Sequence, residues 1–330
     1  MTVIKLLVTL LIVAGLFFAR TLWKLSIIRK RVAREIGETR VEKIKDPGSV
    51  QSLTVLPLVD YYASRDDLKT EAAVSYHIAA DGTNILMDVG ANGKKEHPSP
   101  LIHNMEKLGV RLEDLTFLYI SHVHLDHVGG MREQKTRQFS FSAGPVTLPA
   151  IPVYSPEPLK PSARNPGPDA RVINEPVVLA DGVVSIGTIP RALYLLGYTV
   201  ENALAVKIEG KGIALIIGCG HQTIERIIER ARALFDDPIY AIIGGLHLPG
   251  GGGRMKIGPV DIQPIVGTDR FPWNKMNLDD TRAAIEAVKK VNPEILALSP
   301  HDSSDASLDM FSQAFGDRFQ VIQAGRPIVL

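Results

Sequence analysis

Three histidines and one aspartate lie close together in the segment Ser121–Gly130, which reads SHVHLDHVGG. Their spacing is H-x-H-x-D-H, and they come directly after the apolar run Phe117–Ile120, a pattern typical of a buried strand that ends in a loop. Neutral imidazole is a good ligand for zinc and other transition metals, and carboxylate suits harder cations. Four such groups can contribute to the binding of two metal ions, but they cannot complete both coordination spheres. Other parts of the chain must therefore supply further ligands.

Six of the nine histidines share one position, at or shortly after the end of an apolar run that predicts a strand. The strands of an α/β sheet bring such exits to one edge, where the loops carry the chemistry. We therefore expect these six histidines to meet in one site: His122, His124, His127, His221, His247 and His301. The other three, His77, His97 and His103, lie in a predicted strand, a Pro-flanked loop and a predicted helix. We expect them to be packing or surface residues.

Two further residues lie at such junctions. Asp88 ends the apolar run Ile85–Met87, one strand pair before the histidine motif, and an acid at this position can cap a turn. The single cysteine of the chain, Cys219, lies two residues before His221. We expect it to be a small buried residue, with a thiolate ligand or nucleophile as the alternative. One cysteine excludes an intrachain disulfide and fits a reducing compartment.

The composition is that of a globular chain with ample material for a core. There are 330 residues, 45% of them hydrophobic, and the formal net charge is +1. This length allows one large domain or two small ones. A net charge near zero gives no electrostatic case for binding nucleic acid, so we expect no nucleic-acid partner.

The N-terminal segment differs from the rest of the chain. Val3–Ala19 is almost wholly apolar, broken only by Lys5 and Thr9, and a helix of about 20 apolar residues can cross a bilayer. A cleaved signal peptide and a core or interfacial helix are the alternatives. The first is disfavoured by a poor cleavage site around Ala19, the second by the all-round hydrophobicity. We interpret the chain as a membrane anchor (1–28), a charged juxtamembrane linker (29–50) and a soluble domain (51–330).

The charges around the apolar stretch predict its orientation. Only Lys5 precedes the membrane-spanning part, whereas six basic residues follow it: Arg20, Lys24, Arg29, Lys30, Arg31 and Arg34. By the positive-inside rule, the chain is expected to cross the cytoplasmic (inner) membrane once, with the soluble domain on the cytoplasmic side.

This orientation predicts protection from external protease. Protease added to intact cells or spheroplasts is expected to leave the C-terminal domain uncut, and to digest it only after the membrane is disrupted. The measurement is an immunoblot against a C-terminal tag. Rapid digestion in intact spheroplasts would place the domain on the opposite side.

From Gln51 onward, strand-like and helix-like runs alternate, which predicts an α/β fold. The segment Tyr154–Pro168 contains five prolines, and we expect an exposed, partly stiff loop without regular structure. Gly250–Gly253 is not followed by the Gly-Lys-Ser/Thr of a phosphate-binding loop. A flexible active-site loop is therefore expected over Gly250–Asn277, with Arg254, Lys256 and Trp273 available to contact an anionic or aromatic substrate.

The segment SHVHLDHVGG resembles the metal-binding motif of the metallo-β-lactamase fold superfamily. Gly218–His221, Gly244–Leu248 and the ending Ala314–Gly325 (AFGDRFQVIQAG) are similar to one branch of it. That branch includes the archaeal 7,8-dihydropterin-6-methyl-4-(β-D-ribofuranosyl)aminobenzene 5′-phosphate synthases. The likeness extends from about Gln51 to Leu330 and implies an αββα sandwich, with a metal site at one edge of two sheets.

The resemblance also implies roles for the residues at the site. His122 and His124 would bind one ion, Asp126 and His127 a second, and His221 and His301 would complete the coordination spheres. Asp88 would orient the metal-binding loop, and His247 would contact the substrate rather than a metal. His301-Asp302-Ser303-Ser304 stands where the branch commonly has His-Cys-Thr-Gly.

The first hypothesis for function is a membrane-anchored hydrolase with two divalent metal ions, zinc first and Mn, Fe or Mg as alternatives. A metal-bound hydroxide would attack a small ester, lactone or phosphate, and Asp126 would steer the water or accept its proton. One alternative is a transferase that condenses a dihydropterin with an aminobenzene ribotide phosphate. Another is a non-catalytic metal-binding membrane protein. Flavodiiron oxidoreduction is disfavoured, because that chemistry usually uses glutamate where His124 stands.

Overall fold

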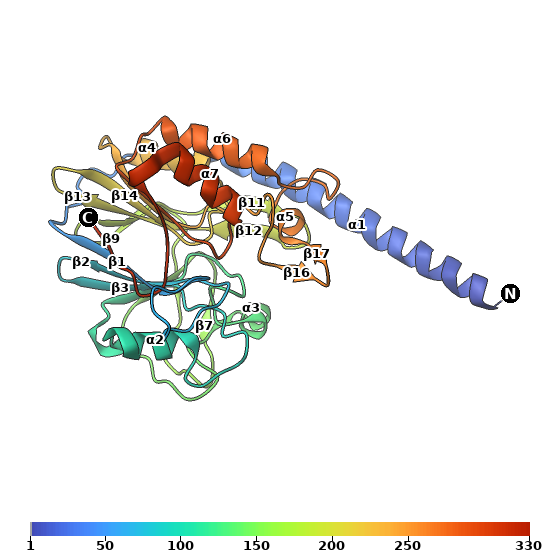
Figure 1. Cartoon of the computed structure of the whole chain (residues 1–330), viewed down its shortest axis with the longest axis horizontal. Coiled ribbons are helices and arrows are strands. Elements are labelled where there is room, and N and C mark those ends of the chain that lie inside the picture. Colours follow the sequence, from blue (N-terminus) through green and yellow to red (C-terminus); the bar gives the residue numbers. More distant parts are fainter. Residues whose placement is uncertain (1) are drawn as a thin grey trace.

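The computed structural model of the chain describes residues 2–330 and contains two seven-stranded sheets that pack face to face (Figure 1). Helices cover both outer faces of this sandwich, and one long helix extends away from it. The strand orders are β20-β1-β2-β3-β4-β6-β8 and β19-β18-β15-β14-β13-β10-β9. This architecture confirms the αββα sandwich that was expected from the sequence.

The first sheet combines an antiparallel part with a parallel part. β1, β2 and β3 pair antiparallel, whereas β3, β4, β6 and β8 run parallel. The strands are β1 (Leu53–Val59), β2 (Ser75–Ala80), β3 (Thr83–Met87), β4 (Phe117–Tyr119), β6 (Val153–Ser155), β8 (Arg171–Val172) and β20 (Ile328–Val329). β4 is buried along its whole length, which explains why its sequence is an uninterrupted apolar run.

The second sheet also combines an antiparallel part (β9, β10, β13 and β14) with a parallel part. β14, β15, β18 and β19 run parallel, and β14 is buried at every residue. The strands are β9 (Val177–Ala180), β10 (Val183–Ser185), β13 (Ala203–Ile208), β14 (Gly212–Ile217), β15 (Ile239–Gly244), β18 (Ile295–Leu298) and β19 (Phe319–Val321). Apolar side chains of both sheets interdigitate in one core layer between them.

Helices with one apolar face complete the sandwich. α4 (Ile224–Leu234) buries the residues at helical spacing that predicted it, and α7 (Asp305–Phe315) buries Leu308, Phe311 and Phe315 as expected. α6 (Leu278–Lys289) begins with a capping box between Asn277 and Asp280. On the first sheet lie α2 (Pro100–Leu108) and α3 (Met131–Thr136), and the two short 3-10 helices are η1 (Leu112–Asp114) and η2 (Gly316–Arg318).

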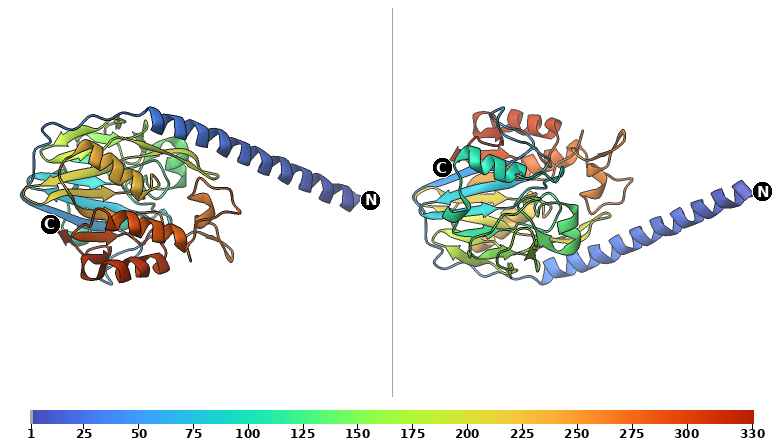
Figure 2. Two further views of the ribbon diagram at one scale, coloured as in Figure 1. Left: turned by 90° about the horizontal axis from the view of Figure 1, so that it is seen from above. Right: turned by 90° about the horizontal axis from the view of Figure 1, so that it is seen from below.

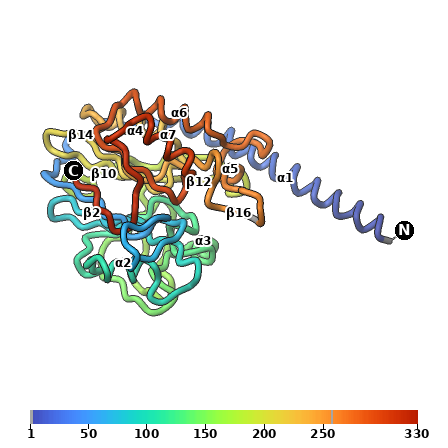
Figure 3. The backbone as a smooth tube through the Cα atoms, viewed as in Figure 1, coloured from blue at the N-terminus to red at the C-terminus, as the bar shows by residue number. Residues whose placement is uncertain are grey.

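Two projections extend from the sandwich on the side where the long helix leaves it (Figure 2). One is the hairpin of β11 (Ile189–Leu193) and β12 (Gly197–Glu201). The other contains β16 (Lys256–Ile257), β17 (Val260–Asp261) and α5 (Gln263–Val266), within the segment expected to form a loop at the active site. Both projections contact the long helix, which Figure 3 traces as a tube: Leu25 and Val32 of this helix pack in one cluster with Tyr194 of the hairpin region and Ile265 of α5.

The long helix α1 (Thr2–Glu38) has two different halves. Residues 3–20 are exposed throughout, and the most apolar window of the helix has a mean hydropathy of 2.2 with none of it buried. Within the described residues, this is the one helix long and apolar enough to cross a membrane, by length and composition. In its second half, Leu25 and Val32 are buried against Ala192 and Tyr194 of the β11–β12 hairpin region.

The Pro-rich segment Tyr154–Pro168 differs from the exposed, irregular loop that was expected. Lys160–Pro161 forms the short strand β7, which pairs with β5 (Gln138–Phe139). The backbone N–H groups of Lys160 and Ser162 make the interstrand bonds, so the proline between them removes no donor that the pairing needs. Asn165 is fully buried and ties the segment to the neighbouring chain, because its carbonyl oxygen accepts from Ser140 Oγ (2.6 Å).

One buried amide positions a segment that supports the site. Asn104 on α2 donates from its side chain to the backbone carbonyls of Leu58 (2.7 Å) and Lys69 (2.8 Å) and accepts from the N–H of Lys69 (2.8 Å). The segment between β1 and β2, which these bonds fix, contains Glu71. Its carboxylate accepts from the backbone N–H groups of three successive residues in the loop after β3, Ala91–Gly93. This loop lies beside the histidine motif, since Val89 donates to the carbonyl of His127.

Removing the amide is expected to destabilise the fold. Asn104→Ala removes the side-chain partner of one buried carbonyl (Leu58) and of the half-buried N–H and carbonyl of Lys69, so the free energy of unfolding should fall by about 1–3 kcal/mol. Denaturant unfolding of the full chain in detergent measures this. Lys107→Ala, on the exposed face of the same helix, should change it by less than about 0.5 kcal/mol. Equal losses in the two variants would contradict the role of the amide.

Candidate metal centre

The predicted site residues lie at the carboxyl ends of five strands. Three of these strands are parallel neighbours in the second sheet and two are parallel neighbours in the first. Their exits therefore meet at one edge of the sandwich. Asp88 follows β3, Ser121–His127 follow β4, Gly218–His221 follow β14, Gly245–His247 follow β15, and Ser299–His301 follow β18.

Five of the predicted ligands form one buried cluster. His122 Nε2 lies 3.0 Å from His124 Nδ1, which lies 3.0 Å from His221 Nε2. The ring centroids of His122 and His127 are 4.1 Å apart, and those of His127 and His301 are 5.6 Å apart. Each of these five residues is at most 8% exposed. The structure therefore joins residues that are separated by up to 179 positions in the chain.

Asp88 holds the histidine motif in place. One carboxylate oxygen accepts from the backbone N–H of Ser121 (2.8 Å), and the other accepts from Ser121 Oγ (2.7 Å) and lies 2.7 Å from His127 Nδ1. The Nε2 atom of His127 is thereby turned away from the carboxylate. Burial opposes the charged form of His127, but the carboxylates of Asp88 and Asp126 raise its pKa to about 9. The same negative field favours a divalent cation.

The other imidazoles of the cluster are held neutral. Burial, together with the charge of neighbouring histidines, lowers the pKa values of His122, His221 and His301 well below the ordinary value. Burial likewise lowers the pKa of His124 to about 3. A neutral imidazole has a free lone pair, so these residues need lose no proton before they bind a metal.

Three nitrogens of the cluster lack hydrogen-bond partners although they are buried: His127 Nε2, His221 Nδ1 and His301 Nε2. On His301 the other nitrogen, Nδ1, is occupied, because it lies 2.6 Å from Ser299 Oγ. An unpaired buried polar atom is costly, and a cation would satisfy it. The donor set therefore fits transition-metal binding, and the residues with free nitrogens are those that the resemblance implies as ligands.

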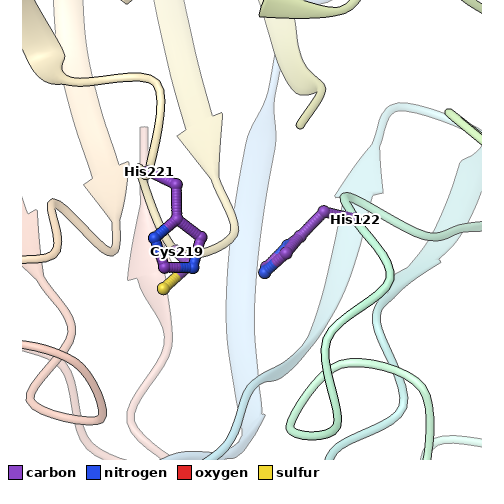
Figure 4. Close-up of side chains that lie close together, drawn as sticks. All are labelled: His122, Cys219 and His221. Atoms are coloured by element: carbon purple, nitrogen blue, oxygen red, sulfur yellow. The ribbon is translucent and has the colours of Figure 1, made fainter. Parts of the chain in front are cut away.

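Cys219 lies among these groups, as Figure 4 shows for His122 and His221. It is buried as predicted, and its sulfur and one nitrogen of each of these histidines all lie within 4.8 Å of one another. The sulfur of Cys219 and one nitrogen each of His127 and His301 likewise all lie within 4.8 Å of one another. Burial and the nearby carboxylates of Asp302 and Glu201 raise the pKa of the thiol well above its ordinary value. The geometry thus adds a neutral sulfur to the cluster.

Asp126 has a different environment from the histidines around it. Its side chain is 24% exposed, and Oδ2 lies 3.7 Å from His127 Nε2. Burial raises the pKa of this carboxyl group. Solvent therefore reaches Asp126, the single acid of the H-x-H-x-D-H motif.

His247 lies at the side of the cluster, in ring contact with His221 at 4.3 Å between centroids. Its backbone has the unusual φ of +49°, and the carboxylate of Asp302 accepts from its N–H (2.8 Å). A Cβ atom built on Gly267 would lie 1.6 Å from His247 Nε2, so only glycine leaves room for the ring. Burial and the charge of Arg191 lower the pKa of His247 to about 3.

Sequence reasoning missed two buried acids that position the loops. Glu201, at the end of β12, accepts from the backbone N–H groups of Cys219, Gly220 and His221, each at 2.8 Å. Asp60, after β1, accepts from Ser299 Oγ (2.7 Å), which contacts His301. Asp60 directly follows the apolar run Val55–Val59, the same signal that identified Asp88, whereas Glu201 is the last residue of β12 and follows no such run. Burial raises the pKa of both carboxyl groups to about 7.

The three histidines expected to be outside the site lie elsewhere, as predicted. His77 is within β2, His97 Nδ1 lies 2.8 Å from Ser142 Oγ, and His103 Nε2 lies 2.9 Å from the carbonyl of Asp67.

An open cleft of about 650 Å³, including its mouth, adjoins the cluster. His221 and His247 form part of its wall, and Arg191, Thr268 and Arg270 of the two projections line it as well. Arg191 Nη2 donates to Asp269 (3.0 Å), while its Nε is buried without a partner. The cleft therefore combines His221 and His247 with two cationic side chains (Arg191 and Arg270) and two acidic ones (Glu225 and Asp280).

The chain is similar to one curated sequence over most of its length. The 7,8-dihydropterin-6-methyl-4-(beta-D-ribofuranosyl)-aminobenzene-5'-phosphate synthase of Methanocaldococcus jannaschii is 23% identical, with 85% of this chain and 98% of the synthase aligned. The family model of the anti-Pycsar protein Apyc1 matches residues 69–154, which include the H-x-H-x-D-H motif.

Solved structures share the fold. A metal-dependent hydrolase of the β-lactamase superfamily superposes with a TM-score of 0.55 and 17% identity, covering 84% of this chain and 98% of that chain. The metallo-β-lactamase fold protein YhfI from Bacillus subtilis gives 0.50 and 14%, covering 85% of this chain and 100% of that chain. At these low sequence identities, the likeness concerns the fold alone.

The close approach of two strand exits gives a test of the geometry. A Cβ atom on Gly218 would lie 2.3 Å from Ser121 Oγ and 3.1 Å from Asp88 Oδ2. Gly218→Ala is therefore expected to displace Ser121 and lower the affinity for a transition metal by about 10–100-fold. Competition with a chromophoric chelator measures this. Gly93→Ala, where a Cβ meets nothing within 4 Å, is the control. If both variants bind metal like the wild type, the packing around Asp88 does not position the ligands.

Proposed function

Because the chain has the metallo-β-lactamase fold, we propose that it is a metal-dependent hydrolase with a two-metal centre at the sheet edge. The observation that carries the proposal is the buried histidine cluster with three unpartnered nitrogens. His122 and His124 would hold one ion, and Asp126 and His127 the other. His221 and His301 would complete the coordination. Zinc is the proposed metal, because neutral imidazole dominates the donor set, and Mn, Fe and Mg are the alternatives.

When bound, two divalent ions lower the pKa of a water molecule and polarise the bond to be cleaved. The residues of the chain have separate tasks in this reaction. Asp126, which solvent reaches, orients the attacking water and accepts its proton. His247 contacts the substrate from the wall of the cleft, where its Nε2 has no protein partner. Asp88 keeps His127 Nε2 directed away from the carboxylate.

The substrate class of this proposal is a small ester, lactone or phosphate. Arg191 contributes a cation to the cleft beside His247, which favours a substrate with an anionic group. The cleft is lined by residues of both projections, so the substrate is bound partly by residues outside the sandwich.

A second candidate is a transferase that condenses a dihydropterin with an aminobenzene ribotide phosphate. The observation in its favour is the aligned length of the M. jannaschii synthase, 98% of which is covered. In that case the same cleft would bind two substrates rather than one substrate and water. A non-catalytic metal-binding role is the third candidate.

We further propose that α1 anchors the protein in the cytoplasmic membrane, with the domain on the cytoplasmic side. The exposed apolar surface of residues 3–19 and the basic residues after them support this. The proposed organisation is an anchor (1–28), a juxtamembrane segment (29–50) and the metallo-β-lactamase-like domain (51–330).

Elemental analysis tests the centre. The purified full chain is expected to hold about two metal ions, and His124→Ala and His221→Ala should each lose at least one. His103→Ala removes a histidine outside the cluster and should leave the metal content unchanged. Wild-type metal content in both cluster variants would contradict the proposed site.

Substrate panels separate the candidate functions. The metal-loaded protein is expected to hydrolyse generic phosphodiesters or lactones, and Asp126→Asn should lower kcat by roughly 10²–10⁴-fold. Turnover of the dihydropterin and ribotide pair, without hydrolysis, would favour the transferase. No turnover of any class at full metal occupancy would favour the non-catalytic role.

A further inference from the structure

Apolar side chains are exposed on both projections that flank α1. Leu195 and Leu196, at the turn of the β11–β12 hairpin, are 55% and 43% exposed, and Trp273, after α5, is 68% exposed. Phe271, which is half-buried, stacks on Trp273 with 4.9 Å between ring centroids. We call these four residues the rim. Large exposed apolar groups that gather in one region mark an interaction surface.

The rim lies at the level of α1 where its apolar stretch ends. The rings of Trp273 and Phe18 are 6.4 Å apart, and Ala19-Arg20 directly follow Phe18. Leu195 and Leu196 line a groove together with Phe17 of the same helix. Where residues 3–19 cross a bilayer, the rim therefore lies in the interfacial layer.

The chemistry of the rim suits that layer. Tryptophan is enriched at membrane interfaces, where an indole can contact both acyl chains and head groups. The exposed lysines Lys24 and Lys275 lie in the same region of the sequence as Phe18 and Trp273 and can attract anionic head groups. The occupant that fits an apolar rim continuous with an apolar helix is the bilayer itself.

The backbone conformation at Leu195 indicates that the two leucines of this turn serve an interaction rather than folding. Leu195 has a φ of +65°, in the left-handed region, where a residue with a branched apolar side chain costs about 1–2 kcal/mol. Asn or Gly would form this turn without that cost. Two exposed leucines at a strained turn contribute little to folding, but they would contribute to a membrane contact.

The same two projections line the cleft beside the histidine cluster. Arg191 lies on β11, four positions before Leu195, and Thr268 and Arg270 precede Trp273. Arg191 has a buried Nε without a partner and faces the pocket that His221 and His247 also line. An anionic head group in the cleft would lie beside Arg191, and an attached chain could follow the rim into the bilayer.

We propose that the rim is a second membrane contact and that the cleft admits an amphiphilic phosphate ester resident in the bilayer. This rests on the proposed hydrolase and on membrane insertion of α1. In the reaction, a water oxygen forms a bond to phosphorus. The bond from phosphorus to the leaving oxygen breaks, and that oxygen takes a proton. A lipid-borne phosphate and a free one share this chemistry, so the test must distinguish them.

The chain has two tryptophans, Trp23 and Trp273, which allows each to be observed alone. The full chain is reconstituted into vesicles of phosphatidylcholine and phosphatidylglycerol, with lipids brominated near the head group or deep in the acyl chain. In Trp23→Phe, Trp273 is the only tryptophan, and shallow bromines should lower its emission about twofold or more, as for a side chain in the interface. Trp273→Phe leaves Trp23 and reports whether α1 is inserted.

A pair of substrates with the same leaving group tests the substrate class. Hexadecyl p-nitrophenyl phosphate enters the bilayer, whereas ethyl p-nitrophenyl phosphate stays in water. The metal-loaded wild type should favour the hexadecyl ester by about tenfold or more in kcat/KM. Replacing both leucines (L195S with L196S) should lower the hexadecyl-to-ethyl ratio by about tenfold.

The outcomes separate this inference from the hydrolase on which it rests. An unquenched Trp273 beside a quenched Trp23 would overturn the rim contact, as would quenching of neither tryptophan. Equal turnover of the two esters would overturn the amphiphilic substrate while the hydrolase stands. Turnover of neither ester, with Trp273 quenched, would overturn the phosphate-ester substrate but support the membrane contact, and hydrolysis of lactones would then decide whether the hydrolase stands.

Discussion

The candidate site depends on one buried carboxylate. Asp88 is fully buried and accepts from both the backbone and the hydroxyl of Ser121, while it also contacts His127. The carbonyl of Ser121 in turn accepts from the N–H of Asn202, which begins the connection into the second sheet. Asp88 therefore fixes the exit of β4 relative to the exit of β3 and, through Ser121, to the other half of the sandwich. The positions of the clustered histidines follow from this arrangement.

The same device recurs at the other exits. Glu201 holds the loop before His221, Asp302 holds the backbone of His247, and Asp60 reaches His301 through Ser299. Each acid is buried, and burial raises the pKa of all three. Burial disfavours the charged form of each carboxyl group. A divalent cation among the histidines would supply positive charge to the whole group, so ligand positioning and charge balance favour the same occupant.

The histidines were predictable because each follows an apolar run, and a buried strand in a parallel sheet has a simple sequence pattern. His122, His221 and His301 could thus be assigned to one edge without knowledge of the loops. Glu201 and Asp60 were missed because a single acid at a strand end is equally typical of a surface turn. Only the three-dimensional structure shows that both are buried. The Pro-rich segment was mispredicted for a related reason, because pairing by alternate N–H groups tolerates Pro161.

Packing of α1 explains how attachment to a membrane would orient the site. Along β12, Tyr198 faces α1 and donates to Glu35 (2.6 Å), whereas Thr199 faces the site with Oγ1 3.4 Å from His124 Nε2. Alternating side chains of one strand therefore contact the helix and the histidine cluster. Because the helix is packed on this strand, residues 39–50 do not separate the apolar stretch from the domain. The orientation of the cleft toward a bilayer would then be set by packed side chains, without a flexible linker.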